Sequence, residues 1–146
     1  MPKEVTAILV LTALFILFLL PNIRLLKINE AVVIERLGSF LKVIDKPGVF
    51  FLIPLFDRVV QKESLLPIEK TWVVIDSDTQ IMYAYTYQIV DIKMFCYAAT
   101  DPITFAEEKM AQRIQSGLDD LESIKDIWLD MGVNLLDFQK IEKNNF

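Results

Sequence analysis

The sequence predicts an α+β protein, with a membrane helix at the N-terminus followed by one domain of antiparallel strands and two helices. Three observations support this prediction. The first part of the chain contains a long apolar run without charge. Residues 28–90 are rich in β-branched and aromatic residues between turn residues, and beyond Thr100 the apolar residues recur at helical spacing. Strands that come first and helices that come later are typical of an α+β domain.

The segment Val5–Leu20 is expected to anchor the chain in a membrane. It contains 16 residues without a charge. A helix of that length spans about 24 Å, somewhat less than the hydrocarbon core of a bilayer. Pro21 then interrupts the run, and Ile23–Lys27 is expected to continue its apolar face with two cations that can reach the headgroups. The side chains expected inside the membrane include Val5, Ile8, Leu9, Leu11, Leu14, Phe15, Phe18 and Leu20.

Two other interpretations of this segment compete with the anchor. A cleaved signal peptide would need small residues at a cleavage site, and the residues after the apolar run are Leu-Leu-Pro-Asn-Ile. A buried core helix is a weak alternative, because a helix that is apolar all round makes poor use of a small core. The C-terminal flank carries Arg24, Lys27 and Arg36. The N-terminal flank has Lys3 and the terminal amine, offset by Glu4, so the positive-inside rule favours a cytoplasmic domain.

The strand region is divided by residues that favour turns. Asp45–Gly48 contains Pro-Gly, which suits a type II turn because proline presets φ and glycine accepts a positive φ. The run Val49–Phe56 is almost entirely apolar but contains Pro54, which confines it to a sheet edge or a loop. The other expected strands are Ile28–Leu37, Phe40–Ile44, Arg58–Lys62, Trp72–Ile75 and Gln80–Val90.

Two helices and a closing strand are expected after Thr100. Asp101 is an N-cap followed by proline, and the first helix has an apolar face made by Ile103, Ala106, Met110, Ile114 and Gly117. Asp119 and Glu122 have capping-box spacing at the start of the second. Its stripe is Leu121, Ile124, Trp128 and Met131, and it ends at Gly132 before a strand over Val133–Ile141. The expected organisation is therefore an anchor at 1–27, a domain at 28–142 and a polar tail at 143–146.

The composition excludes several classes of chemistry. The chain has no histidine, and its single cysteine, Cys96, rules out an internal disulfide or a cysteine metal cluster. Cys96 lies in the apolar stretch Met94–Tyr97, which is taken as a strand, so an inert thiol is expected. Asp76, Asp78 and Asp91 are expected to be solvated turn residues. No catalytic residue, cofactor or metal is expected, and the net charge of −5 gives no nucleic-acid surface.

Three stretches of the chain resemble the stomatin/prohibitin/flotillin family, known as the band 7 or SPFH domain. They are Ile34–Phe40, Pro47–Phe51 and Ile53–Val59, with the order, the spacing and the upstream anchor of that family. The likeness covers about Ile28 to Glu142 and implies an SPFH-like fold. It also implies mainly architectural roles for Glu35, Arg36, Gly38, Phe40, Pro47, Gly48, Pro54 and Asp57. A charge pair between Arg36 and Asp57 is one expected consequence.

The resemblance implies a non-enzymatic membrane scaffold or regulator. Such a protein would associate laterally with like SPFH subunits in a membrane microdomain, or flank a larger membrane complex such as a protease or a channel. Family members continue into a long charged coiled coil, whereas this chain ends at Phe146, so a subunit that joins or caps a ring of longer relatives is expected. The alternative is a monomeric, membrane-tethered binding module or inhibitor of one membrane partner.

The apolar run around Pro54 admits two interpretations. It is either a buried strand of the core or a second membrane contact, in which the loop residues enter the headgroup boundary. The candidate membrane-contact residues are Phe50, Phe51, Leu52 and Ile53.

Overall fold

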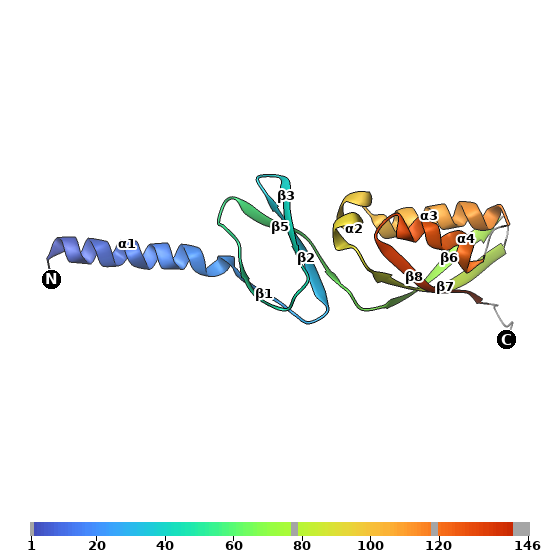
Figure 1. Cartoon of the computed structure of the whole chain (residues 1–146), viewed down its shortest axis with the longest axis horizontal. Coiled ribbons are helices and arrows are strands. Elements are labelled where there is room, and N and C mark those ends of the chain that lie inside the picture. Colours follow the sequence, from blue (N-terminus) through green and yellow to red (C-terminus); the bar gives the residue numbers. More distant parts are fainter. Residues whose placement is uncertain (1, 77–78, 118–119, 142–146) are drawn as a thin grey trace. The chain divides into compact units, whose positions relative to one another are not determined.

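The computed structural model describes residues 2–76, 79–117 and 120–141, which form four α-helices and eight strands (Figure 1). The α+β class is therefore confirmed. The chain divides into two compact units, an N-terminal unit (Met1–Lys62) and a C-terminal unit (Glu63–Phe146), each of which is described by itself. The boundary lies inside the range 28–142 that the sequence suggests as one domain. The expected tail at 143–146 lies outside the described residues.

The N-terminal unit begins with α1 (Lys3–Leu19), which runs directly into a 3-10 turn, η1 (Leu20–Asn22). The segment Lys3–Asn22 is long and apolar enough to cross a membrane, and none of it is buried, so it is not a core helix. At 1.5 Å per residue in α1 and 2.0 Å in η1, it rises about 31 Å. This length matches the hydrocarbon core of a bilayer better than the expected sixteen-residue run.

The residues that follow η1 form a strand, which corrects the expectation that Ile23–Lys27 extends the apolar face of an anchor. β1 (Ile23–Leu26) pairs antiparallel with β4 (Gly48–Phe51), so that Ile23 lies opposite Phe51. The side chain of Leu26, the last residue of β1, is buried, while the other three residues of the strand are exposed. The backbone groups of these residues are satisfied by a distant partner that local spacing does not reveal.

A second sheet of the N-terminal unit has the strand order β3-β2-β5. β2 (Glu30–Arg36) is the central strand, with β3 (Ser39–Ile44) and β5 (Asp57–Ser64) beside it. The two sheets of this unit share one small core because Leu26 of β1 packs in the same buried cluster as side chains of β2. The cluster consists of Leu26, Val32, Ile34 and Leu52.

Gly48 starts β4 with φ +147°, so the positive φ expected of this glycine is observed. The angle differs from the +80° or so of a type II turn, because Gly48 already belongs to the β1–β4 ladder.

The C-terminal unit is a three-stranded antiparallel sheet with helices on one face (Figure 1). The strand order is β6-β7-β8, with β6 at Ile68–Asp76, β7 at Thr79–Ile89 and β8 at Val133–Ile141. α3 (Pro102–Gln115) and α4 (Leu121–Leu129) are both present, but Gly117, expected on the apolar face of the first of them, lies beyond its end and is exposed. Alternate side chains of β7 point to one face of the sheet, and the side chains of α3 and α4 cover that face. The buried ones include Tyr83, Tyr85, Tyr87, Ala106, Met110, Ile124 and Trp128.

Two sequence expectations in this unit are wrong. Met94–Tyr97, expected as a strand, lies in a third domain helix, α2 (Ile92–Ala98), which begins where the Asp91 carboxylate accepts a hydrogen bond from the Met94 backbone N–H at 2.9 Å. The N-cap of α4 is Asp120, which accepts from the Ser123 backbone N–H at 3.0 Å. The expected cap, Asp119, lies outside the described residues, as does Asp78.

Candidate functional site

The expected charge pair between Arg36 and Asp57 is present, and it joins β2 to β5. The guanidinium binds the carboxylate in a bidentate manner, with Nε 2.6 Å from Oδ1 and Nη2 3.0 Å from Oδ2. Oδ2 also accepts a hydrogen bond from the Ile53 backbone N–H at 2.9 Å. The pair therefore fixes the β4–β5 loop to the end of β2 as well as joining the two strands.

A second pair lies beside the first and was missed by sequence reasoning. Arg58 donates to Oε2 of Glu35 from Nη2 at 2.7 Å and from Nε at 3.1 Å. Glu35 is only 6% exposed, so its charge requires a partner. Each acidic residue of the dipeptides Glu35-Arg36 and Asp57-Arg58 thus pairs with the basic residue of the other dipeptide, across two adjacent strands. The available signal was that both dipeptides place an acidic residue directly before an arginine.

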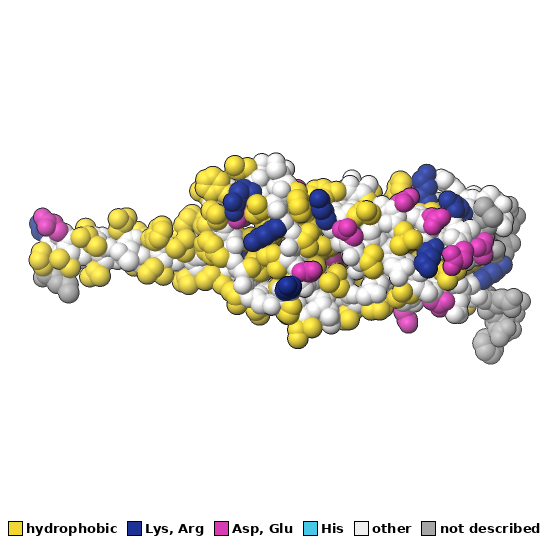
Figure 2. Space-filling model, viewed as in Figure 1, with side chains coloured by type: hydrophobic (Ala, Val, Ile, Leu, Met, Phe, Trp, Pro, Cys, Tyr) yellow, Lys and Arg dark blue, Asp and Glu magenta, His cyan; other side chains and the backbone are white. Residues whose placement is uncertain are grey.

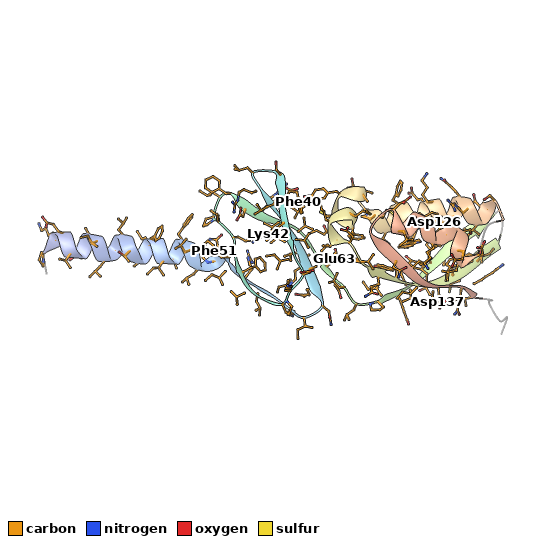
Figure 3. The ribbon with its side chains drawn as sticks, viewed as in Figure 1. Phe40, Lys42, Phe51, Glu63, Asp126 and Asp137 are labelled. Carbon is orange, nitrogen blue, oxygen red and sulfur yellow. The ribbon has the colours of Figure 1, made fainter. Side chains whose placement is uncertain are left out.

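The two pairs contain three of the residues that carry the family likeness, Glu35, Arg36 and Asp57. Gly38 has φ +83°, and Pro54 lies in the loop before β5. Pro47 is exposed before β4, and Phe40 is 40% exposed in β3 (Figure 3).

The Arg36–Asp57 pair has a measurable pH signature. The Arg36 guanidinium and the Ile53 N–H lower the pKa of Asp57 from 3.8 to about 2. The stabilisation it provides is therefore present above pH 3.8, the ordinary pKa of an unfolded aspartate, and is lost as the pH falls through about 2. Arg36→Gln is expected to raise the pKa of Asp57 toward 3.8, measured by the pH dependence of its ¹³Cγ chemical shift in the full chain.

Arg58→Gln is the matched control for that titration. The substitution also removes one positive charge, at the residue next to Asp57. The guanidinium of Arg58, however, binds Glu35 and not Asp57. The pKa of Asp57 is expected to remain near 2 in this variant. Equal shifts in both variants would show that general charge, and not the bidentate bond, sets this pKa.

The candidate membrane-contact residues divide between the core and the surface. Leu52 is buried and Phe50 packs against the core cluster, whereas Phe51 is 48% exposed and Ile53 is exposed. Phe51 lies beside the C-terminal end of α1 (Figure 3), because the β1–β4 register sets it opposite Ile23. A hydrogen bond of 3.0 Å from the Leu52 N–H to the Asn22 carbonyl holds the loop to the end of η1.

Two further exposed leucines lie on the loops next to this segment. Sequence reasoning missed Leu37, whereas Leu55 belongs to the apolar run Val49–Phe56 without being among the candidate contact residues. Leu55 is 90% exposed and Leu37 is 74% exposed. Both have a positive φ, +70° and +52°, a conformation that costs a non-glycine residue about 1–2 kcal/mol. The Leu37 N–H donates to the Phe56 carbonyl at 2.9 Å, so the two loops are in contact. We define Leu37, Phe51, Ile53, Leu55 and Phe56 as the apolar loop patch; all five are exposed. Figure 2 shows hydrophobic side chains along α1 and over the adjoining part of the N-terminal unit.

If the apolar loop patch contacts the membrane, a label on the patch is expected to lie deeper in the bilayer than a label elsewhere on the N-terminal unit. A cysteine at Leu55, in a Cys96→Ala background, is expected to carry a bimane label whose fluorescence is quenched by brominated lipids in reconstituted vesicles. A label at Lys46 is the control, because it is exposed beyond the Leu26–Gly48 end of the β1–β4 ladder, away from the anchor. We expect several-fold stronger quenching at position 55. Equal quenching at both positions would contradict membrane contact by this patch.

The electrostatic character of the two units differs. Met1–Lys62 contains eight Lys and Arg residues and five Asp and Glu residues. Glu63–Phe146 contains seven Lys and Arg residues and 15 Asp and Glu residues. The net charge of −5 is therefore the sum of +3 in the N-terminal unit and −8 in the C-terminal unit.

The main polar cluster in the C-terminal unit stabilises the fold. The Tyr85 hydroxyl donates to Glu107 at 2.5 Å, and Lys70 lies 2.7 Å from the same carboxylate oxygen. Burial, together with Glu107, raises the pKa of Tyr85 far above its ordinary value, so the phenol stays protonated. Among the described residues no group of three or more potential metal ligands occurs. Asp91 serves as a helix cap, Asp76 ends β6, and Cys96 is half-buried in α2.

No protein-family model matches this chain, and no curated protein matches it either.

Proposed function

We propose that this chain is a non-enzymatic, membrane-anchored scaffold or regulator of the SPFH type, with Lys3–Asn22 as an uncleaved anchor. The observation that carries the proposal is the direct connection between the anchor and the folded unit. No linker separates η1 from β1, and the Asn22–Leu52 hydrogen bond joins the end of the anchor to the loop after β4. A domain held this closely acts on neighbours in the plane of the membrane. The Arg24 and Lys27 flank favours the cytoplasmic face.

The C-terminal unit offers a surface for such lateral association. Val73, Met82 and Ile141 lie opposite one another across β6, β7 and β8, and each is exposed. They form a row on the side of the sheet opposite the buried tyrosines of β7, because side chains alternate along a strand. We call Val73, Met82 and Ile141 the apolar row. Like SPFH subunits, or a larger membrane complex such as a protease or a channel, are the proposed partners.

The test is the native mass of the full chain and its co-purifying proteins after extraction in mild detergent. We expect an oligomer or a stable membrane complex, and Met82→Glu is expected to shift it toward the monomer by placing a charge at the centre of the apolar row. Phe105→Glu is the control, since Phe105 is an equally exposed apolar residue on α3. A monomeric particle without partners contradicts lateral association. A monomer bound to a single membrane protein would favour the alternative, a tethered binding module.

A further inference from the structure

The N-terminal unit contains a cavity of about 700 Å³ at the end of the anchor. It is formed where the β1–β4 sheet meets the β2–β5 strands. Its lining combines apolar side chains with three cations and one carboxylate, and includes Asn22, Arg24, Asp57, Arg58, Val59 and Lys62. A volume of this size is within the range of roughly 300–1,000 Å³ that is typical of small-ligand sites.

The charges around the cavity leave one cation available. Asp57 is neutralised by Arg36, Arg58 is paired with Glu35, and Lys62 lies 2.8 Å from Glu30. Arg24, in contrast, makes no ion pair within the described part of the chain. An anion in the cavity would therefore meet the free guanidinium of Arg24, with Arg58 and Lys62 nearby. Arginine is well suited to a phosphate because it can donate two parallel hydrogen bonds.

The position of the cavity identifies the source of that anion. Asn22, which ends η1, and Arg24, one residue into β1, both line it. If Lys3–Asn22 spans the hydrocarbon core, these residues lie at headgroup depth. The lining also includes Ile23, Leu25, Phe50 and Leu52, which suit the glycerol and upper acyl carbons of a lipid more than a free phosphate ion.

We propose that this cavity binds the phosphate headgroup of an acidic phospholipid, with Arg24 as the principal contact. This inference rests on the anchor in the proposed function and adds a lipid preference to it. Bound lipid would fix the N-terminal unit against the bilayer, next to the apolar loop patch.

Native mass spectrometry of the full chain in mild detergent tests the proposal. Phosphatidylglycerol and phosphatidylcholine with the same acyl chains are added separately. We expect phosphatidylglycerol to be retained at least about fivefold more, and Arg24→Gln to remove this preference. Arg24 is exposed, so its replacement leaves the fold intact. Lys27→Gln is the matched control, because Lys27 is an exposed cation just after β1 that does not line the cavity, and it is expected to stay within about twofold of the unmodified chain.

A second variant distinguishes lipid binding inside the cavity from attraction by positive charge alone. Val59→Phe fills part of the cavity from a half-exposed position without changing any charge, and it is expected to lower phosphatidylglycerol retention about as much as Arg24→Gln. Equal losses for Arg24→Gln and Lys27→Gln, or no loss for Val59→Phe, would overturn the proposal. So would competition by glycerol phosphate at the same concentration as the lipid, which would indicate a site for free phosphate.

Alkaline extraction of membranes distinguishes failure of the lipid-site proposal from failure of the membrane anchor in the proposed function. If the chain is released by carbonate, the membrane anchor of the proposed function is wrong. If the chain stays in the membrane and shows no headgroup preference, only the cavity assignment is overturned.

Discussion

Trp128→Ala is expected to lower the free energy of unfolding of the C-terminal unit by about 3–5 kcal/mol. Trp128 is 0% exposed and packs against two aromatic rings of β7. Its ring centroid is 5.3 Å from that of Tyr85 and 5.5 Å from that of Tyr87, and its Nε1–H donates to Met110 Sδ at 2.9 Å. Alanine removes these contacts between α4, α3 and the sheet, and leaves a cavity that the surrounding strands cannot close.

Fluorescence isolates this measurement to one unit, since the two tryptophans, Trp72 and Trp128, both lie in the C-terminal unit. Guanidinium denaturation of the full chain in detergent, followed through Trp72, gives the change in stability of the Trp128→Ala variant. Trp72→Phe, followed through Trp128, is the control. Trp72 is only half-buried, so a loss of about 1 kcal/mol is expected there. A loss below about 1 kcal/mol for Trp128→Ala would contradict its central role in the core.

The elements that could be predicted from sequence are those whose pattern is complete within one segment. The closing strand has the expected bounds, Val133–Ile141, and Ile124 and Trp128 of the predicted apolar stripe are buried in α4 as their spacing predicts. β1 could not be recognised because its four residues are defined by pairing with β4, about 25 residues later. α2 was mistaken for a strand because seven residues are too few to show a helical period, although Asp91 offered a capping signal.

The candidate site, like the fold, could be predicted only where the signal lies within one segment of the chain. The Arg36–Asp57 pair was expected from the motif, but the exchange of partners with Glu35 and Arg58 depends on which strands are neighbours. The exposed and buried members of Phe50–Ile53 could not be separated, because an entirely apolar run carries no polar residue to reveal its register. The positive φ of Leu55 was unpredictable, since leucine has no preference for that conformation.

Gly132→Ala is the second substitution with a large expected effect, about 2–5 kcal/mol in the free energy of unfolding of the C-terminal unit. Gly132 follows α4 with φ +73°, as expected of a residue that ends a helix. A Cβ added there would lie 2.3 Å from the Asp91 carbonyl oxygen and 2.9 Å from the Cβ of Met94. The Gly132 carbonyl also accepts hydrogen bonds from the Val90 and Asp91 N–H groups, each at 2.9 Å. The turn cannot move away without breaking these bonds, so the clash is not relieved.

Gly117→Ala is the matched control, because Gly117 has φ +82° after α3 but nothing within 4 Å of an added Cβ. Only the cost of the left-handed conformation applies there, about 1–2 kcal/mol. The difference between the two variants in the same tryptophan-detected denaturation therefore measures the close contact between the α4–β8 turn and the start of α2. Equal losses in the two variants would show that α2 withdraws to accommodate the methyl group. A larger loss for Gly132→Ala would establish that α2, the helix that the sequence did not reveal, is held rigidly against this turn.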